Sequence, residues 1–368
     1  MLFRSIADSK DGFFLTKSMD ESIVVDAEAR TVTVNAGITY GRLAVELQRQ
    51  GFALHNLASL PHISVAGACS TGTHGSGEKN GNLATAASGL ELVTASGDVL
   101  HLSRKDEIFR GAVVGLGALG VVTRVTLDIQ PTYQMRQYVY ENLPLDQMRD
   151  HFDAIEASGY SVSLFTDWQK KRVNEVWVKV RGTVEAPAEL FGARRATRNL
   201  HPIAELSAEN CTEQLGVPGP WYDRLPHFKM GFTPSAGKEL QSEYFVPRQH
   251  AVEAILALGK MRDQITPHLM ISEIRAIAAD DLWLSPAYQR PSIALHFTWK
   301  PDWESVRKLL PVIERELGPF GPRPHWGKLF TMSPRASYEK MPEFVAMCKR
   351  LDPGGKFQNE FLGSEVFG

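Results

Sequence analysis

The sequence predicts an α+β fold, and this prediction depends on two β-hairpins with an amphipathic helix between them. Residues 22–34 contain two runs rich in Val and Thr around a polar turn at 27–30, which is typical of a hairpin. Residues 90–102 repeat this pattern around a turn at 95–98. Strands that pair locally, with helices in separate runs of the chain, indicate the α+β class.

The helix between the hairpins is predicted over residues 40–49. Leu43, Val45 and Leu47 supply its apolar positions, and Gly51 follows as a stop signal. We therefore expect these three side chains to form the apolar face of the helix.

The pattern changes beyond Pro131, where longer strand-like runs are followed by helices. The predicted strands and helices of this part are, in order, strands 161–166, 176–180 and 242–246, helix 249–262, strands 269–277 and 293–298, and helix 303–317. This order predicts a second domain, a sheet with helices on one face.

Composition excludes several classes of function. A formal net charge of -2 argues against a nucleic-acid surface. No apolar run is long enough to span a bilayer, and the N-terminus lacks the apolar core of a signal peptide. The three cysteines, Cys69, Cys211 and Cys348, are scattered without the spacing of metal ligands and suit a reducing compartment. We therefore expect a cytoplasmic protein with no metal site.

The segment 67–82, GACSTGTHGSGEKNGN, carries the strongest functional signal. Its glycines allow backbone N–H groups to approach a ligand closely, and its Ser and Thr side chains add hydroxyl donors. Such a loop suits a pyrophosphate, whose oxygens need many fixed donors. The apolar lead-in at 63–66 indicates a loop that lies against a core.

Two better-known phosphate motifs do not explain the chain. The loop is close to the P-loop pattern, but Glu78 stands where the lysine is required. Residues 115–120 match G-x-G-x-x-G, yet they follow a predicted helix at 108–116 and precede a strand at 121–127. A dinucleotide fingerprint has the opposite context, so we expect this match to make a tight turn from helix to sheet.

Polar side chains alternate with apolar ones on two strands of the second domain. Glu273 and Arg275 are two residues apart and therefore point to the same face, as do His296 and Thr298. On one strand alone, such polar side chains could simply belong to the solvent-exposed face of a sheet. Two of them, together with Lys328 in an aromatic segment, predict a converging site.

Several segments in the same order resemble one family of flavoenzymes. Residues 55–85 and 115–127 resemble the flavin domain of the vanillyl-alcohol-oxidase type. Segments 160–168, 210–228, 272–280 and 324–330 narrow the resemblance to the bacterial alditol oxidases, also called xylitol oxidases, which are related to the aldonolactone oxidases. The resemblance implies an FAD-binding (PCMH-type) domain at 1–131, a substrate-binding cap domain at 132–320, and a C-terminal segment, 321–368, that returns to the FAD domain.

The resemblance also implies roles for individual residues. The positions that hold the polyol correspond to Ser59, Glu273, Arg275, Thr298 and Lys328. The positions that contact FAD correspond to Ser59, Ser64, Gly67, Thr71, Gly72, Thr73, His74, Val122 and His325. Lys328, Arg275 and Glu273 are the catalytic candidates, because a hydroxyl-rich neutral substrate needs paired donors and acceptors.

The implied reaction is hydride transfer from the terminal carbinol carbon of the polyol to flavin N5, which gives an aldose. Molecular oxygen then reoxidises the flavin and yields hydrogen peroxide. Arg275 and Lys328 would stabilise the developing alkoxide. Glu273 and His325 are both candidates for the group that takes the hydroxyl proton.

The N-terminus departs from the family pattern. Met1 aligns where the family has a histidine that carries the flavin covalently, and the preceding strand-helix-strand unit is absent. No His precedes His55, so a covalent histidyl linkage to FAD is not supported. The first sheet is then expected to have an unpaired edge.

Three interpretations follow. The first is an N-terminally truncated alditol oxidase that acts on xylitol or sorbitol. The second is an aldonolactone oxidase or dehydrogenase, of the arabinono- or gulono-1,4-lactone type, that uses oxygen or another acceptor. The third is a remnant without enzymatic activity that binds a polyol or a partner protein. In each case we expect a monomer.

Overall fold

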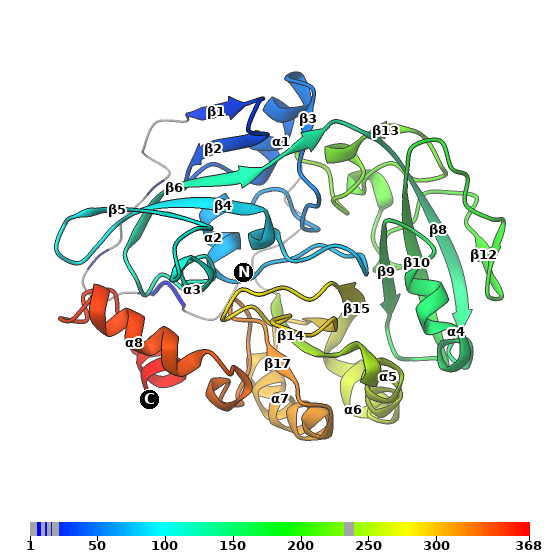
Figure 1. Ribbon diagram of the computed structural model, residues 1–368. Coiled ribbons are helices and arrows are strands. Elements are labelled where there is room, and N and C mark those ends of the chain that lie inside the picture. The colour runs from blue at the N-terminus through cyan, green and yellow to red at the C-terminus, as the bar shows by residue number, and fades with distance from the viewer. Residues whose placement is uncertain (1–5, 9–11, 13–15, 17–21, 232–238) are drawn as a thin grey trace.

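The computed structural model describes residues 6–8, 12, 16, 22–231 and 239–368. Two large sheets organise these residues, and Figure 1 shows the smaller one beside the larger one, with several helices on the far side of the larger sheet. This arrangement confirms the α+β class.

The smaller sheet has five strands in the order β1-β2-β6-β4-β5. Its strands are β1 (Ile23–Asp26), β2 (Thr31–Asn35), β4 (Ala87–Val93), β5 (Val99–Ser103) and β6 (Val121–Asp128). β1 pairs with β2 and β4 pairs with β5, all antiparallel, so both predicted hairpins are confirmed. Among the described strands β1 pairs only with β2, which leaves it at an edge of the sheet.

Helix α1 (Tyr40–Arg49) has the predicted bounds. Leu43 and Leu47 are buried, and Gly51 ends the helix in the left-handed region with φ of 82°. The prediction for Val45 is wrong, since its side chain is 44% exposed. Positions 43 and 47 are four apart and share a face of the helix, whereas position 45 points away from that face.

The glycine-rich segment is not a loop throughout. Its first residues belong to a short helix, α2 (Val65–Ser70), which packs with Val65 and Cys69 buried. The turn begins after this helix, where Gly72 has a φ of 63°. The expectation of a loop at 67–70 is therefore corrected, because tertiary packing stabilises a helix that the local sequence does not favour.

The second glycine motif, residues 115–120, makes the predicted turn, although the helix before it is shorter than predicted. Helix α3 covers only Phe109–Ala112, so the predicted helix to Leu116 is wrong at its C-terminal end. Leu116 and Gly117 both have positive φ, which ends the helical run early. Residues 115–120 then turn the chain directly into β6.

The larger sheet has ten strands, and every pairing between its strands is antiparallel. The strands are β8 (Gln134–Pro144), β9 (Ser161–Thr166), β10 (Arg172–Arg181), β11 (Glu189–Leu190), β12 (Ala193–Arg195), β13 (Gly219–Pro220), β14 (Leu240–Pro247), β15 (Leu269–Ile277), β16 (Ser292–Trp299) and β17 (Arg323–Pro324). All five predicted strands are present, and β10 extends beyond the predicted run in both directions.

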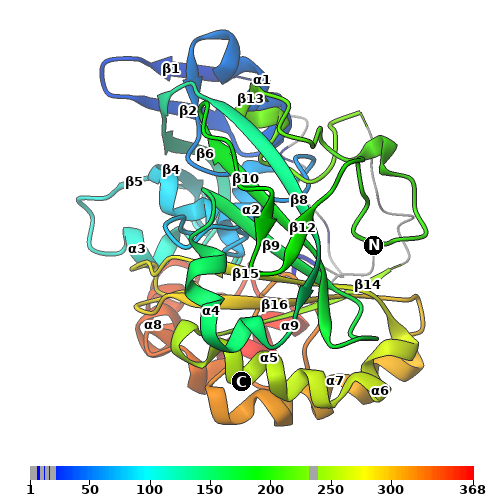
Figure 2. The ribbon, with the colours of Figure 1, turned by 90° about the vertical axis from the view of Figure 1, so that its right-hand side faces the viewer.

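Helices cover one face of this sheet, as Figure 2 shows for the side turned away from the smaller sheet. They are α4 (Gln147–Glu156), α5 (Ala251–Lys260), α6 (Arg262–Ile265) and α7 (Trp303–Leu317). Trp303–Leu317 has the predicted bounds, and the predicted helix 249–262 is α5 with a separate short α6 after it. The opposite face of the larger sheet, which these helices do not cover, faces α2 and the loop that follows it.

The C-terminal part holds α8 (Met341–Leu351) and α9 (Glu360–Leu362), and a small sheet joins β3 (Phe52–Ala53) to β7 (Gln130–Pro131). Lys356 Nζ donates to the carbonyl oxygen of Ala95, in the turn between β4 and β5, at 2.7 Å. This contact fits the predicted return of 321–368 to the first domain, and the domain boundaries stay a prediction. Among the described residues, no helix has the length and apolar character needed to cross a membrane.

Candidate active site

A cavity of about 950 Å³ lies between the glycine-rich segment and the free face of the larger sheet. The loop wall of this cavity is formed by Ser59, Ser64, Gly67, Thr71, Thr73 and His74. The sheet wall is formed by Glu243, Glu273, Arg275, His296, Thr298, His325 and Lys328. Apolar residues, among them Leu60, Ile63, Phe165, Ile203, Phe228 and Ile271, line the remainder.

Strand register brings the charged residues of the sheet wall together. Glu273 on β15 pairs with His296 on β16, and His296 pairs with Glu243 on β14. The three side chains therefore form a row across the sheet. Arg275 and Thr298 lie two residues further along their strands on the same face, as the alternation of side chains predicts.

Glu243 is the centre of the sheet wall, although no motif in the sequence singles it out. Its Oε1 lies 2.5 Å from Arg275 Nη2, and its Oε2 lies 2.5 Å from Lys328 Nζ. The side chain is fully buried. Burial alone would raise the pKa of Glu243, but Lys328 and Arg275 hold that pKa well below its usual value. Glu243 is thus an ionised counterion that fixes two of the predicted donors.

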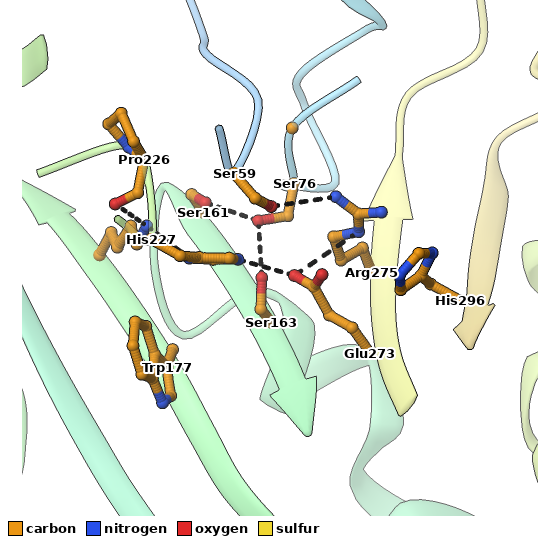
Figure 3. Close-up of polar contacts among 12 residues, drawn as sticks. Ser59, Ser76, Ser161, Ser163, Trp177, Pro226, His227, Glu273, Arg275 and His296 are labelled. Carbon is orange, nitrogen blue, oxygen red and sulfur yellow. Dashed lines mark hydrogen bonds and ion pairs between the residues drawn. The ribbon is translucent and has the colours of Figure 1, made fainter. Parts of the chain in front are cut away.

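Glu273 is held by a second set of contacts, which Figure 3 shows. Its Oε1 accepts from His227 Nε2 at 2.8 Å and lies 3.6 Å from Arg275 Nε. Arg275 Nη1 in turn lies 3.5 Å from Ser59 Oγ. Burial would raise the pKa of Glu273, but Arg275 and His227 keep that pKa well below its usual value. Oε2 of Glu273 meets no donor among the described residues, so this atom is available to a ligand.

Lys328 links Glu243 to the histidine of the central strand. Its Nζ donates to His296 Nδ1 at 2.8 Å, and His296 Nε2 lies 3.1 Å from Thr298 Oγ1. Burial lowers the pKa of Lys328, although Glu243 opposes this effect. Burial and then Lys328 lower the pKa of His296 to about 3, so this imidazole is neutral. His296 lines the cavity, as its spacing from Thr298 on one face of the strand predicts.

His325 also lines the cavity. Its Nδ1 accepts from the backbone N–H of Gly327 at 3.0 Å, so the proton of the neutral ring resides on Nε2. Burial, followed by Lys328, holds the pKa of His325 well below its usual value. His325 therefore has no free lone pair with which to accept a proton.

One group of side chains has the spacing of metal ligands. Within the described ranges this group is His74, Glu243 and His325, whose ligand atoms lie within 4.8 Å of one another. Both carboxylate oxygens of Glu243 already meet the cations Arg275 and Lys328. A divalent cation would meet two positive charges at this place, and charge therefore disfavours a metal here.

The loop wall fits the flavin predicted for it. Thr71 Oγ1 donates to the carbonyl oxygen of Gly67 at 3.0 Å and lies 3.0 Å from Thr73 Oγ1, so of these two hydroxyls only that of Thr73 can donate to a ligand in the cavity. Gly67 is exposed and lines the cavity without a side chain, and a Cβ there would stand 2.7 Å from Ser64 Oγ and displace that hydroxyl. Small residues and hydroxyl donors around a cavity of this size suit the ring and phosphates of FAD.

The structure brings most of the predicted site residues to one cavity. All five predicted substrate residues line it, as do the predicted FAD contacts on the loop wall and His325. Gly72 and Val122 are not among its lining residues: Gly72 packs near Pro286, and Val122 lies on β6. Their contact with FAD stays a prediction.

Two family models match the chain. "FAD binding domain" matches residues 5–103, which include the loop wall, and "D-arabinono-1,4-lactone oxidase" matches residues 233–365, which include the sheet wall. The two walls of the cavity thus fall into two separately recognised sequence families.

Similarity to curated proteins extends over nearly the whole chain. The alditol oxidase of Streptomyces sp. (strain IKD472 / FERM P-14339) is 48% identical over 365 residues, which cover 98% of this chain and 87% of that protein. The chain belongs to the alditol oxidase family. The L-gulonolactone oxidase of Bos taurus is a more distant relative, 29% identical over 96% of this chain and 85% of that protein.

Solved structures support the fold of this alditol oxidase family member. A cholesterol oxidase from Brevibacterium sterolicum has a TM-score of 0.72 at 16% identity, with 94% of this chain and 83% of that chain covered. A carbohydrate oxidase from Microdochium nivale has a TM-score of 0.70 at 13% identity, with 93% and 80% covered. The chain is accordingly an FAD-dependent oxidoreductase of the alditol oxidase family.

Proposed function

We propose that this protein oxidises the terminal hydroxyl of an alditol such as xylitol or sorbitol to the aldose, with oxygen as the electron acceptor. The observation that carries the proposal is the cavity: all five residues predicted to bind a polyol line it, four of them on the sheet wall, which faces the loop wall, and Ser59 on the loop wall itself. Family membership at 48% identity to an alditol oxidase supports it further.

The sheet wall suits a neutral, hydroxyl-rich ligand. Glu273 offers Oε2 as an acceptor, while Arg275 and Lys328 offer N–H donors whose two charges Glu243 and Glu273 together balance. Thr298 and Ser59 can donate or accept. Because Glu243 contacts both cations and Glu273 supplies the second negative charge, the donors are fixed before the substrate arrives.

FAD, when bound by the loop wall, would accept the hydride and pass electrons to oxygen. Arg275 and Lys328 would stabilise the negative charge that develops on the substrate oxygen, because both are held in a buried site. Glu273 suits the role of an oriented acceptor better than that of a base, since neighbouring cations depress its pKa. His325 is unsuited to accept the proton, because its Nδ1 is already bonded to Gly327.

The test is an anaerobic visible spectrum of the protein supplied with FAD and then with xylitol. Bleaching of bound flavin by xylitol, followed by recovery and hydrogen peroxide when oxygen is admitted, is the expected result. Bound flavin that xylitol leaves oxidised would refute alditol oxidation. Absence of bound flavin would refute the assignment of the loop wall.

An aldonolactone is the second candidate substrate. The match of "D-arabinono-1,4-lactone oxidase" to residues 233–365 favours it, since this part supplies the sheet wall. A lactone also presents hydroxyls to Glu273, Arg275 and Lys328. Galactono-1,4-lactone run beside xylitol and sorbitol separates the two, because the better substrate bleaches the flavin faster.

We also propose a monomeric, cytoplasmic enzyme. The three cysteines are free and buried, which suits a reducing compartment. Light scattering in solution tests the oligomeric state, and a mass well above 40.9 kDa would refute the monomer.

A further inference from the structure

A buried lysine lies behind the sheet wall without reaching the cavity. Lys179, on β10, is fully buried and is not among the residues that line the cavity. Its Nζ donates to the carbonyl oxygen of Leu225, to that of Pro226 at 3.2 Å, and to Nδ1 of His227 at 3.1 Å. An ammonium group has three protons, and these three acceptors use all of them.

The contact with His227 determines which nitrogen of this imidazole carries the proton. A charged lysine can only donate, so while Lys179 is protonated Nδ1 of His227 accepts and the proton of the neutral ring resides on Nε2. Nε2 then donates to Glu273 Oε1 at 2.8 Å. Lys179 is thereby connected to Glu273 through one imidazole ring.

Aromatic side chains and the backbone keep the His227 ring in place. The rings of Phe165 and Trp177 meet it edge to face, with centroids 5.4 Å and 5.2 Å away. Figure 3 shows His227 between Pro226 and Glu273, with its ring directed at the carboxylate. The backbone N–H of His227 donates to the carbonyl oxygen of Ser59 at 3.0 Å, which ties this segment to the loop before α2.

The charges around the pair agree with a neutral His227. Burial, followed by Lys179, lowers the pKa of His227 to about 4, while Glu273 opposes this shift and Arg275 adds to it. Burial lowers the pKa of Lys179 to about 7, with Glu273 and Cys211 opposing and Arg275 adding. His227 is therefore uncharged at neutral pH, and Glu273 is the anion nearest to it.

We propose that Lys179 is a positioning residue for substrate binding, which holds His227 as the Nε2–H tautomer so that Glu273 Oε1 is occupied and Oε2 faces the substrate. Without Lys179, Nδ1 is free to carry the proton. Nε2 would then present a lone pair to the carboxylate, and Glu273 would lose its donor. The effect on substrate binding rests on the proposed alditol function, whereas the tautomer of His227 does not.

The first test measures the tautomer directly in the FAD-loaded protein. Long-range ¹H–¹⁵N spectra of protein labelled at histidine identify His227 by the signal that His227→Phe removes. The expected signals show a neutral ring with Nε2 protonated from about pH 5 to 6, where Lys179 is charged. An Nδ1-protonated ring or an imidazolium in the unmodified protein would overturn the proposal without any activity measurement.

The second test uses two substitutions and their combination. Lys179→Met should raise KM for xylitol about tenfold with a smaller change in kcat, as expected for loss of one charge-assisted hydrogen bond in the binding site. His227→Phe should raise KM by a similar factor. The double variant should be no worse than His227→Phe alone, because Lys179 acts only through the imidazole.

The matched control is Glu156→Gln. Glu156 is a fully buried titratable residue on α4 that does not line the cavity, so its substitution should leave KM for xylitol unchanged. Effects of Lys179→Met and His227→Phe that multiply would overturn the proposal, since independent losses of packing add in free energy. Failure of the unmodified protein to oxidise xylitol would refute the proposed function and leave the tautomer result to decide the role of Lys179.

Discussion

The two walls of the cavity are built in opposite ways. The loop wall comes mainly from one continuous segment, in which small residues, hydroxyls and a short helix lie close together in sequence. The sheet wall comes from three strands and the segment after β17, and its charges meet only because the strands pair in one register. The loop wall offers space and neutral donors, whereas the sheet wall offers charges that neutralise one another.

This difference implies a division of labour between the walls. A cofactor with many phosphate and ring atoms needs space and many weak donors, which a glycine-rich segment supplies. A small neutral polyol needs a few fixed, directional partners, and buried ion pairs hold Arg275 and Lys328 in place for it. Substitutions in the loop wall should therefore affect FAD binding, and substitutions in the sheet wall should affect oxidation of the substrate.

The largest effect is expected for Lys328→Ala. This change removes a donor that we propose contacts the reacting hydroxyl, so turnover of xylitol should fall by about 10²–10³-fold while FAD remains bound. Arg275→Ala should act in the same way. Steady-state oxidation measures the turnover, and flavin absorbance measures the bound FAD.

Lys79→Ala is the matched control, because the side chain of Lys79 is 90% exposed. This variant should turn over xylitol normally. Full turnover of xylitol by Lys328→Ala would show that Lys328 does not belong to the substrate site.

Glu243→Gln should be the most damaging change to stability. It leaves Arg275 and Lys328 buried without their shared counterion, and breaking a buried pair in this way costs about 3–5 kcal/mol. Urea unfolding at pH 7 measures this loss in the free energy of unfolding. A loss below about 1 kcal/mol would show that the carboxylate does not hold the sheet wall together.

The contribution of Glu243 to the free energy of unfolding should also depend on pH, and Glu243→Gln measures this dependence. Because the folded state lowers the pKa of Glu243 below the ordinary value of 4.5, its contribution is complete above that pH and is lost as the pH falls through the folded pKa. The difference in unfolding free energy between the unmodified protein and Glu243→Gln should therefore narrow below about pH 4.5. A difference that stays constant down to acid pH would contradict an ionised Glu243.

The smallest effect is expected in the loop wall, from Gly67→Ala. The new Cβ would stand 2.7 Å from Ser64 Oγ, which must turn away, so FAD affinity should weaken by about fivefold, or ~1 kcal/mol. Fluorescence titration with FAD measures this change. Gly354→Ala is the control, since no atom lies within 4 Å of its new Cβ. Equal FAD affinity in both variants would show that Gly67 does not border the cofactor.

The sequence predicted the elements and missed the connections between them. Residues 161–166, 269–277 and 303–317 have the predicted bounds, because each has a clear period and end signals. Period-two alternation also placed Glu273 and Arg275 on one face. Local patterns carry this information, so a single sequence can reveal it.

Glu243 and His227 were missed because their roles depend on contacts distant in sequence. Glu243 lay within a predicted strand, but only the pairing of β14 with β16 brings it to Lys328. His227 meets Lys179, 48 residues earlier, and then Glu273, 46 residues later. The available signal was a charged residue within an apolar strand, as at Glu243 and Lys179, because a buried charge requires a partner.

The most direct test of the two-walled site is a crystal structure of the protein with FAD and with xylitol bound under anaerobic conditions. We expect the isoalloxazine ring against the loop wall and the polyol against the sheet wall, with hydroxyls bonded to Glu273 Oε2, Arg275 and Lys328. A polyol bound away from these three residues, or FAD that makes no contact with the loop wall, would contradict the account.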